Sequence, residues 1–200
     1  MKHLLTLTSI VLVTSATVIA FQSGHSIVQK QAAGSTFVAK EPDFSLWSEM
    51  RIKDYKESLT AHIAPAIALL RIPEIQLEVP VLEGTDDLSL NRAVGLIAGT
   101  ARPGEDGNIG IAGHRDGFFR GLKDVQEGDR IELVMATRTD TYTIDHIVVV
   151  TPDDVTVIAP RGRPSITLVT CYPFYFVGSA PQRYIVQASM NPRMKAHRQY

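Results

Sequence analysis

Three side chains that together can carry out acyl transfer stand at the ends of predicted strands. Cys171, the only cysteine of the chain, closes the β-like run Ile166-Thr-Leu-Val-Thr-Cys171, and Arg183 opens another such run twelve positions later. His114 follows a third run, within Gly110-Ile-Ala-Gly-His114. Acyl transfer needs a nucleophile, a proton-transfer group and a positive donor for the developing oxyanion. A thiol, an imidazole and a guanidinium supply these three functions.

Each of these residues, taken alone, also has a structural explanation. A single cysteine is a buried thiol, an intermolecular bridge or a reactive group. Arg183 can pair with a surface carboxylate, and His114 can pack at its strand end beside Gly113, which permits close backbone approach and unusual dihedral angles. The combination favours chemistry. If the strands that flank the loop over residues 172–182 are adjacent, the thiol and the guanidinium meet at one end of a sheet.

Short β-like runs separated by Gly, Pro, Asn and Asp fill the chain from residue 66 to residue 190. We expect strands at residues 66–72, 75–82, 108–113, 130–136, 139–150, 165–170 and 183–188. Many short strands with frequent turn signals predict an all-β sandwich or barrel. Short helices are expected at residues 86–93 and 153–158, where Asp86 and Asp153 are suited to cap the first turn.

The chain ahead of these strands divides into two segments. Residues 1–21 begin with Lys2 and continue with an uncharged, mostly apolar run that is about long enough to cross a bilayer as a helix. We expect an uncleaved membrane anchor there, with a cleaved signal peptide as the alternative, and the rest of the chain outside the cytoplasm. Residues 22–65 are expected to form a linker and a helical extension that packs on the domain through Trp47.

Composition and motif spacing exclude several classes of function. The formal net charge is −1, whereas a nucleic-acid-binding domain usually shows a strong basic excess. Only the last segment, residues 191–200, forms a basic tail. The sequence has no His-x-x-x-His motif and no paired cysteines, so we expect neither a metal site nor another cofactor.

The residues quoted above resemble those of sortases, the cysteine transpeptidases of bacterial cell surfaces. The family pattern Thr-Leu-x-Thr-Cys matches residues 167–171, the family's strand-end histidine matches His114, and its catalytic arginine on the next strand matches Arg183. The similarity runs through the whole predicted domain. The segments around His114 and after Cys171 look most like class D sortases and their relatives in Gram-negative bacteria.

The resemblance implies a closed eight-stranded β-barrel over residues 66–190, with short helices and a site at one rim. Cys171 would attack the threonine carbonyl of an LPxTG-like sorting motif in a surface protein and form a thioacyl-enzyme. His114 would transfer protons, and Arg183 would stabilise the oxyanion or orient the substrate. An amine acceptor, a cell-wall peptide or another amine, would resolve the intermediate. Thr170 and Tyr172 are candidate substrate contacts, with strand packing as the alternative for Thr170.

Two alternatives remain open from the sequence. One is an exported β-domain that binds an extended peptide without turnover. The other is an L,D-transpeptidase-like peptidoglycan cross-linker. That family favours a His-Gly-Cys neighbourhood with an arginine close behind, whereas Val169 and Thr170 precede Cys171 here and Arg183 lies much farther on.

Overall fold

The computed structural model describes residues 42–175 and 179–190. The predicted anchor over residues 1–21, most of the predicted linker and the basic tail over residues 191–200 lie outside the described residues. Among the described residues, no helix combines the length and the apolar composition needed to cross a membrane.

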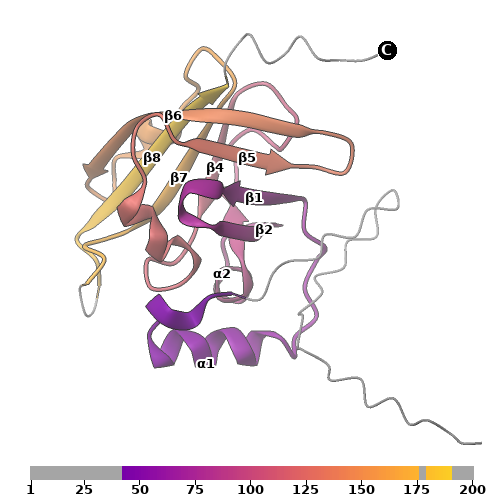
Figure 1. Cartoon of the computed structure of the whole chain (residues 1–200), viewed down its shortest axis with the longest axis vertical. Coiled ribbons are helices and arrows are strands. Elements are labelled where there is room, and N and C mark those ends of the chain that lie inside the picture. Colours follow the sequence, from indigo (N-terminus) through magenta and orange to yellow (C-terminus); the bar gives the residue numbers. More distant parts are fainter. Residues whose placement is uncertain (1–41, 176–178, 191–200) are drawn as a thin grey trace, which may run out of the picture.

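Eight strands of the described chain close into a barrel in the order β1-β2-β3-β4-β7-β8-β6-β5 (Figure 1). The strands are β1 (Ala68–Ile72), β2 (Leu77–Glu83), β3 (Val94–Leu96), β4 (Asn108–Ala112), β5 (Arg130–Val134), β6 (Thr139–Val150), β7 (Ser165–Tyr172) and β8 (Gln182–Met190). The pairs β2–β3 and β4–β7 are parallel, and the other neighbours are antiparallel. The predicted all-β, closed eight-stranded barrel is confirmed.

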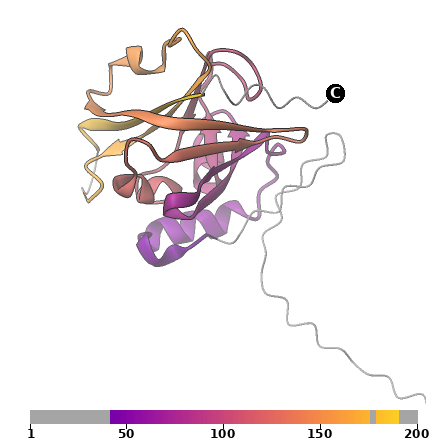
Figure 2. The same ribbon diagram turned by 45° about the horizontal axis from the view of Figure 1, so that its top comes forward.

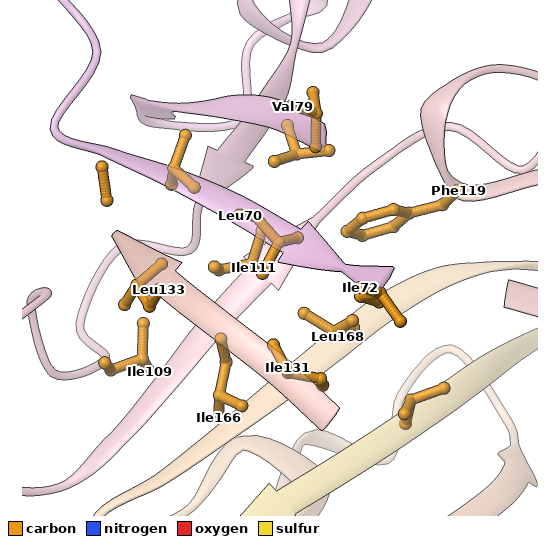
Figure 3. Close-up of a cluster of buried hydrophobic side chains, with 14 of the residues drawn as sticks. Leu70, Ile72, Val79, Ile109, Ile111, Phe119, Ile131, Leu133, Ile166 and Leu168 are labelled. Atoms are coloured by element: carbon orange, nitrogen blue, oxygen red, sulfur yellow. The ribbon is translucent and has the colours of Figure 1, made fainter. Parts of the chain in front are cut away.

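Alternate residues of the strands fill the barrel interior (Figure 3). Ile109 and Ile111 of β4 lie in the core, as do Ile166 and Leu168 of β7, so the residues between them point outward. Burying a side chain of this size typically contributes about 1.5–3 kcal/mol. The core therefore fixes the register of the strands, because a slip by one residue would turn these side chains to the outside.

Short helices connect the strands and cover the barrel. They are η1 (Phe44–Leu46), α1 (Glu49–Ser58), η2 (Pro73–Ile75), α2 (Asp87–Arg92), η3 (Phe118–Asp124) and η4 (Val155–Ile158), of which the η elements are 3₁₀ helices. Asp86 caps α2 as predicted, because its carboxylate accepts a hydrogen bond from the Ser89 amide. The cap predicted for Asp153 is wrong. Asp154 accepts the bond from the Thr156 amide, and the helix begins later, at Val155.

An aromatic cluster attaches the N-terminal extension to the barrel. The Trp47 ring lies 4.8 Å from the ring of Phe118 and 5.6 Å from that of Tyr55, in edge-on geometry. Phe44 completes the cluster. The predicted packing role of Trp47 is thus confirmed. α1, whose N-cap is Ser48, is shorter than the helical stretch expected from residue 42 and lies against α2 outside the barrel (Figure 1).

Gly113 leaves room for the ring of a core phenylalanine. A Cβ atom at this position would lie 2.7 Å from Cδ2 of Phe119, which is fully buried. Close backbone approach is therefore the reason for glycine here. The unusual dihedral angles considered for Gly113 do not occur, since it is not among the described glycines with positive φ.

We expect Gly113→Ala to destabilise the protein by about 1–3 kcal/mol, the usual cost of overpacking a core. For a domain of this size the melting temperature falls by roughly 2–4 °C for each kcal/mol. Calorimetry of the purified variant measures this change. The same substitution in a Phe119→Leu background should cost less, because the shorter side chain makes room. An equal cost in both backgrounds would show that the Phe119 contact is not responsible.

Candidate active site

Cys171 and Arg183 lie directly opposite each other on neighbouring strands. The antiparallel register of β7 and β8 pairs Cys171 with Arg183, one residue before β7 ends and one residue after β8 begins. Directly opposed side chains on one face of a sheet have Cβ atoms about 4.5–5.5 Å apart. The connecting loop therefore brings the thiol and the guanidinium together at one end of the sheet.

His114 lies beside the same end of β7. β4 runs parallel to β7 with Ala112 opposite Val169, and the Gly113 amide extends the ladder by donating to the Val169 carbonyl at 3.1 Å. Continuing this alignment by two residues places His114 beside Cys171. The candidate histidine, cysteine and arginine thus come from the adjacent strands β4, β7 and β8 and lie at one edge of the barrel.

The three candidate residues belong to the outer face of these strands. Cys171 has the same parity as Val169, which alternates with the core residue Leu168. Arg183 likewise alternates with the inward residues of β8, and His114 has the parity of Ala112 on β4. The arrangement forms on the outside of the barrel wall, where a substrate can reach it.

Thr170 connects the cysteine strand to the histidine segment. Its side chain is 2% exposed, and its hydroxyl donates to the Gly113 carbonyl at 2.8 Å. This bond fixes the backbone immediately before His114 relative to the backbone immediately before Cys171. Strand packing, the alternative considered for Thr170, is therefore what the geometry shows, and a substrate contact by its hydroxyl stays a prediction.

Aromatic side chains line the start of the loop after Cys171. Tyr172 stacks on Tyr184 with ring centroids 6.0 Å apart, and Phe174 packs edge-on against both rings. Tyr172 is half-buried and Phe174 is buried. Phe176, the next aromatic residue of this loop, lies outside the described residues.

The side chain of Arg183 is hydrogen-bonded to backbone carbonyls just before it in the chain. Its Nη1 donates to the carbonyl of Ala180 at 3.3 Å and to that of Gln182 at 3.0 Å. A guanidinium has five N–H donors, so these bonds orient the side chain without using its whole hydrogen-bonding capacity.

Burial and a neighbouring arginine act on His114 in the same direction. Burial lowers the pKa of His114 below its ordinary value, and the positive charge of Arg51 lowers it further. The carboxylates of Asp116, Asp87 and Asp54 act in the opposite direction. Arg51 belongs to α1, and its Nε donates to Asp116 Oδ1 at 3.2 Å, so α1 is fastened to the loop that begins with His114.

Arg51→Gln is expected to raise the pKa of His114. The substitution removes a positive charge and also releases the carboxylate of Asp116, and both changes favour the protonated imidazole. Asp116→Asn should lower the same pKa. NMR titration of the His114 ring proton measures both shifts. His146, which is exposed on β6 and lies outside the site, serves as an internal control. Shifts of one sign in both variants would contradict this account.

A sequence profile of the sortase domain matches residues 70–191 of the chain. The chain belongs to the sortase family. This sortase is 37% identical to sortase D of Bacillus subtilis (strain 168) over 132 residues, which cover 66% of this chain and 67% of that protein. The class D likeness expected from the sequence is confirmed, and the protein is a cysteine transpeptidase.

Solved sortase structures share the fold. The Clostridium perfringens sortase D5 transpeptidase superposes with a TM-score of 0.59 at 32% identity, covering 74% of this chain and 91% of that chain. Sortase A from Corynebacterium diphtheriae also gives a TM-score of 0.59 at 32% identity, covering 74% of this sortase and 71% of that chain.

Sequence reasoning did not assign roles to Arg51 and Arg120. From the sequence, Arg51 is expected to be a charged residue on the surface of a helix. Arg120 is expected to be a polar residue that follows two phenylalanines. Arg51 contacts Asp116, and Arg120 donates to the carbonyl of Phe174 and lies over the ring of Tyr175. The partners lie more than fifty positions away in each case, so only the folded sortase brings them together.

Proposed function

We propose that this sortase cleaves an LPxTG-like sorting motif through a thioacyl intermediate on Cys171 and transfers the acyl group to an amine acceptor. The observation that carries the proposal is the placement of Cys171 directly opposite Arg183, with His114 at the end of the neighbouring parallel strand. A nucleophile, a proton-transfer group and an oxyanion donor therefore face one position on the outer barrel wall.

In the acylation step, His114 accepts the proton of the Cys171 thiol, because only the thiolate is an effective nucleophile. The lowered pKa of His114 favours the neutral imidazole that can accept this proton. The sulfur attacks the threonine carbonyl, and the guanidinium of Arg183 stabilises the oxyanion. The C–N bond then breaks, His114 returns its proton to the departing amine, and a thioester remains on Cys171.

In the second step, the acceptor amine attacks the thioester. His114 takes a proton from the attacking nitrogen, the C–S bond breaks, and the thiolate regains a proton from the imidazolium. Water can replace the amine as a slower nucleophile. The product is a new amide bond between the surface protein and a cell-wall peptide or another amine.

The outer face of the strands that carry the three residues is partly covered by another segment of the chain. At the opposite end of the same strands, the segment with η4 covers the outer face, since Val157 accepts a hydrogen bond from Gln187 at 2.7 Å and Ala159 accepts one from Asn108 at 3.0 Å. The face is therefore closed at that end. Tyr172 follows Cys171 on β7 and packs with Tyr184 against the core, so a contact between Tyr172 and the bound peptide stays a prediction.

A peptide library tests this function and also reveals the motif. Peptides that carry a fluorophore and a quencher on either side of variants of LPxTG are incubated with the protein, with and without an amine acceptor. Cleavage together with an amine-linked product supports the proposal. Intact peptides that remain bound would indicate a peptide-binding domain without turnover. Activity on muropeptides alone would indicate an L,D-transpeptidase-like cross-linker.

Arg183→Ala should lower turnover of the sorting peptide by about a hundredfold or more, the usual loss when one oxyanion donor is removed. Arg183→Lys should recover little, because an ammonium lacks the planar fork of a guanidinium. Arg138, an exposed arginine paired with Asp140 on the β5–β6 hairpin, offers a matched control whose alanine variant should remain active. Turnover and melting temperature are measured on the same preparations. A melting temperature that falls while turnover per folded molecule stays intact would show a structural role for Arg183.

We also propose that residues 1–21 anchor the protein in the membrane and residues 22–65 extend from it, so that the barrel over residues 66–190 works outside the cytoplasm. The basic Lys2 and the uncharged apolar run after it support this arrangement. Mass spectrometry of protein extracted from membranes gives the test. A mature N-terminus near Phe21 would show a cleaved signal peptide instead.

A further inference from the structure

Arg120 makes a direct connection between the two segments that follow the candidate catalytic histidine and cysteine. It belongs to η3, which begins four residues after His114. Its Nη1 donates to the carbonyl of Phe174, and its guanidinium carbon lies 4.1 Å from the ring centroid of Tyr175. Cation–π contacts of this kind form within about 6 Å of the centroid. Both partners stand at the start of the loop after Cys171.

The position of Arg120 does not suggest a role in the core. The buried residues of η3 are Phe119 and Leu122, whereas Arg120 is half-buried and lines a cavity of about 390 Å³ together with Trp47 and Ile75. Tyr175 is 75% exposed, so its ring does not fill the core either. The side chains of Arg120 and Tyr175 therefore meet outside the core, although Phe174 packs its own ring into the core, and loss of the contact should leave the barrel intact.

The strands themselves hold the three candidate catalytic residues without help from Arg120. The β7–β8 register fixes Cys171 opposite Arg183, and the Thr170–Gly113 hydrogen bond fixes the backbone before His114. At the start of the loop, the core residue Phe174 is well supported and the next residue, Tyr175, has less support. Phe174 packs its ring against Tyr172 and Tyr184, whereas Tyr175 projects toward solvent under the guanidinium of Arg120.

We propose that Arg120 is a positioning residue that holds residues 172–175, the start of the loop after Cys171, against η3, so that this segment is ordered before the sorting peptide binds. A loop that must be ordered on binding weakens affinity, whereas a loop ordered in advance does not. The contact of Arg120 with Phe174 and Tyr175, called the tether below, should therefore affect KM more than kcat. The predicted change in KM rests on the proposed function. The predicted effect of the tether on the order of the segment does not.

Two measurements on one set of variants test the tether. Hydrogen–deuterium exchange of the segment 172–175 reports its order without any substrate, and steady-state kinetics with the cleaved sorting peptide separate KM from kcat. The variants are Arg120→Ala, Arg120→Lys, Tyr175→Leu and Tyr175→Phe. The control is Arg138→Ala, because Arg138 also donates to a backbone carbonyl, that of Gly104 at 3.0 Å. It stands on the β5–β6 hairpin, away from the loop between β7 and β8 (Figure 2).

Arg120→Ala should speed exchange in the segment and raise KM by about tenfold, the scale of one hydrogen bond to a charged group, while kcat changes by less than about threefold. Tyr175→Leu should shift both readouts in the same direction by a smaller factor. Tyr175→Phe keeps the aromatic ring and should match the wild type. Arg120→Lys should change both readouts less than Arg120→Ala does but should not match the wild type, since one ammonium cannot contact both partners as a planar guanidinium does.

Unchanged exchange in Arg120→Ala would overturn the inference, as would a fall in kcat at constant KM or an equal effect in Arg138→Ala. If Arg120→Ala does not fold, Tyr175→Leu carries the same comparison, and wild-type exchange in it would refute the tether. If the wild-type protein cleaves no peptide, the proposed function fails. The exchange comparison then still confirms or refutes the tether by itself.

Discussion

Replacement of Cys171 by alanine is expected to abolish acyl-enzyme formation and peptide cleavage completely while leaving the barrel folded. The thiol is the proposed nucleophile, and no other cysteine in the chain can replace it. Cys171 is half-buried on the outer face of β7, so its removal leaves the interior packing of Ile166 and Leu168 unchanged. Mass spectrometry after incubation with peptide and a melting curve measure the two properties.

Chemical modification gives a second route to the same result. A methanethiosulfonate reagent should modify the wild-type protein once and abolish turnover, and it should leave the Cys171→Ala variant unmodified. Full turnover by Cys171→Ala would show that the thiol is not the nucleophile. Loss of turnover that merely follows loss of folded protein would show a structural role instead.

His114→Ala should lower turnover by roughly a hundredfold to ten-thousandfold, the range that general acid–base catalysis usually contributes. The imidazole is proposed to move a proton in both steps, so acylation and resolution should both slow. A matched control is His146→Ala, because His146 is exposed on β6 and lies outside the proposed site.

The melting temperature of His114→Ala should change far less than its turnover. The backbone of His114 accepts the turn hydrogen bonds from Gly117 and Phe119, and these do not need the imidazole. A large drop in melting temperature with nearly normal turnover per folded molecule would assign His114 to folding. Equal activity losses in His114→Ala and His146→Ala would show that His114 has no specific role in turnover.

The strands that the sequence predicts well are those whose pattern is set by the barrel interior. The alternation over residues 139–150 predicts the bounds of β6 as the structure has them, and the other predicted strands differ from the observed ones by at most two residues at either end. β3 was not predicted because it spans only Val94–Leu96, too short for a period to show. Its pairing with β2 and β4 comes from the closure of the barrel rather than from local sequence.

Two of the short helices were not predicted from the sequence. No helix was expected between His114 and the strand that begins at residue 130, yet η3 forms there and buries Phe119 and Leu122 in the core. Residues 73–75 were expected to lie between and within strands, and Pro73 instead begins the short helix η2. In both cases tertiary packing decides the local structure.

The candidate site was predictable where the chemistry is concentrated in a few residue types. Acyl transfer needs the three groups that the sequence offers at strand ends: a single cysteine, a histidine and an arginine. Each of them therefore supports the functional interpretation of the other two. The residues that hold their surroundings in place were not predictable in the same way. Arg51 and Arg120 act through Asp116 and Phe174, which are distant in sequence, and a surface arginine gives no local sign of such a partner.

The most direct test of the central claim is the mass of the enzyme trapped with its substrate. The protein is mixed with a cleavable sorting peptide in the absence of an amine acceptor, quenched in acid and measured intact. The account predicts an adduct with the mass of the N-terminal peptide fragment, located on Cys171 by fragmentation, released by hydroxylamine and missing in Cys171→Ala. Cleaved peptide without an adduct on Cys171, or an adduct on another residue, would contradict it.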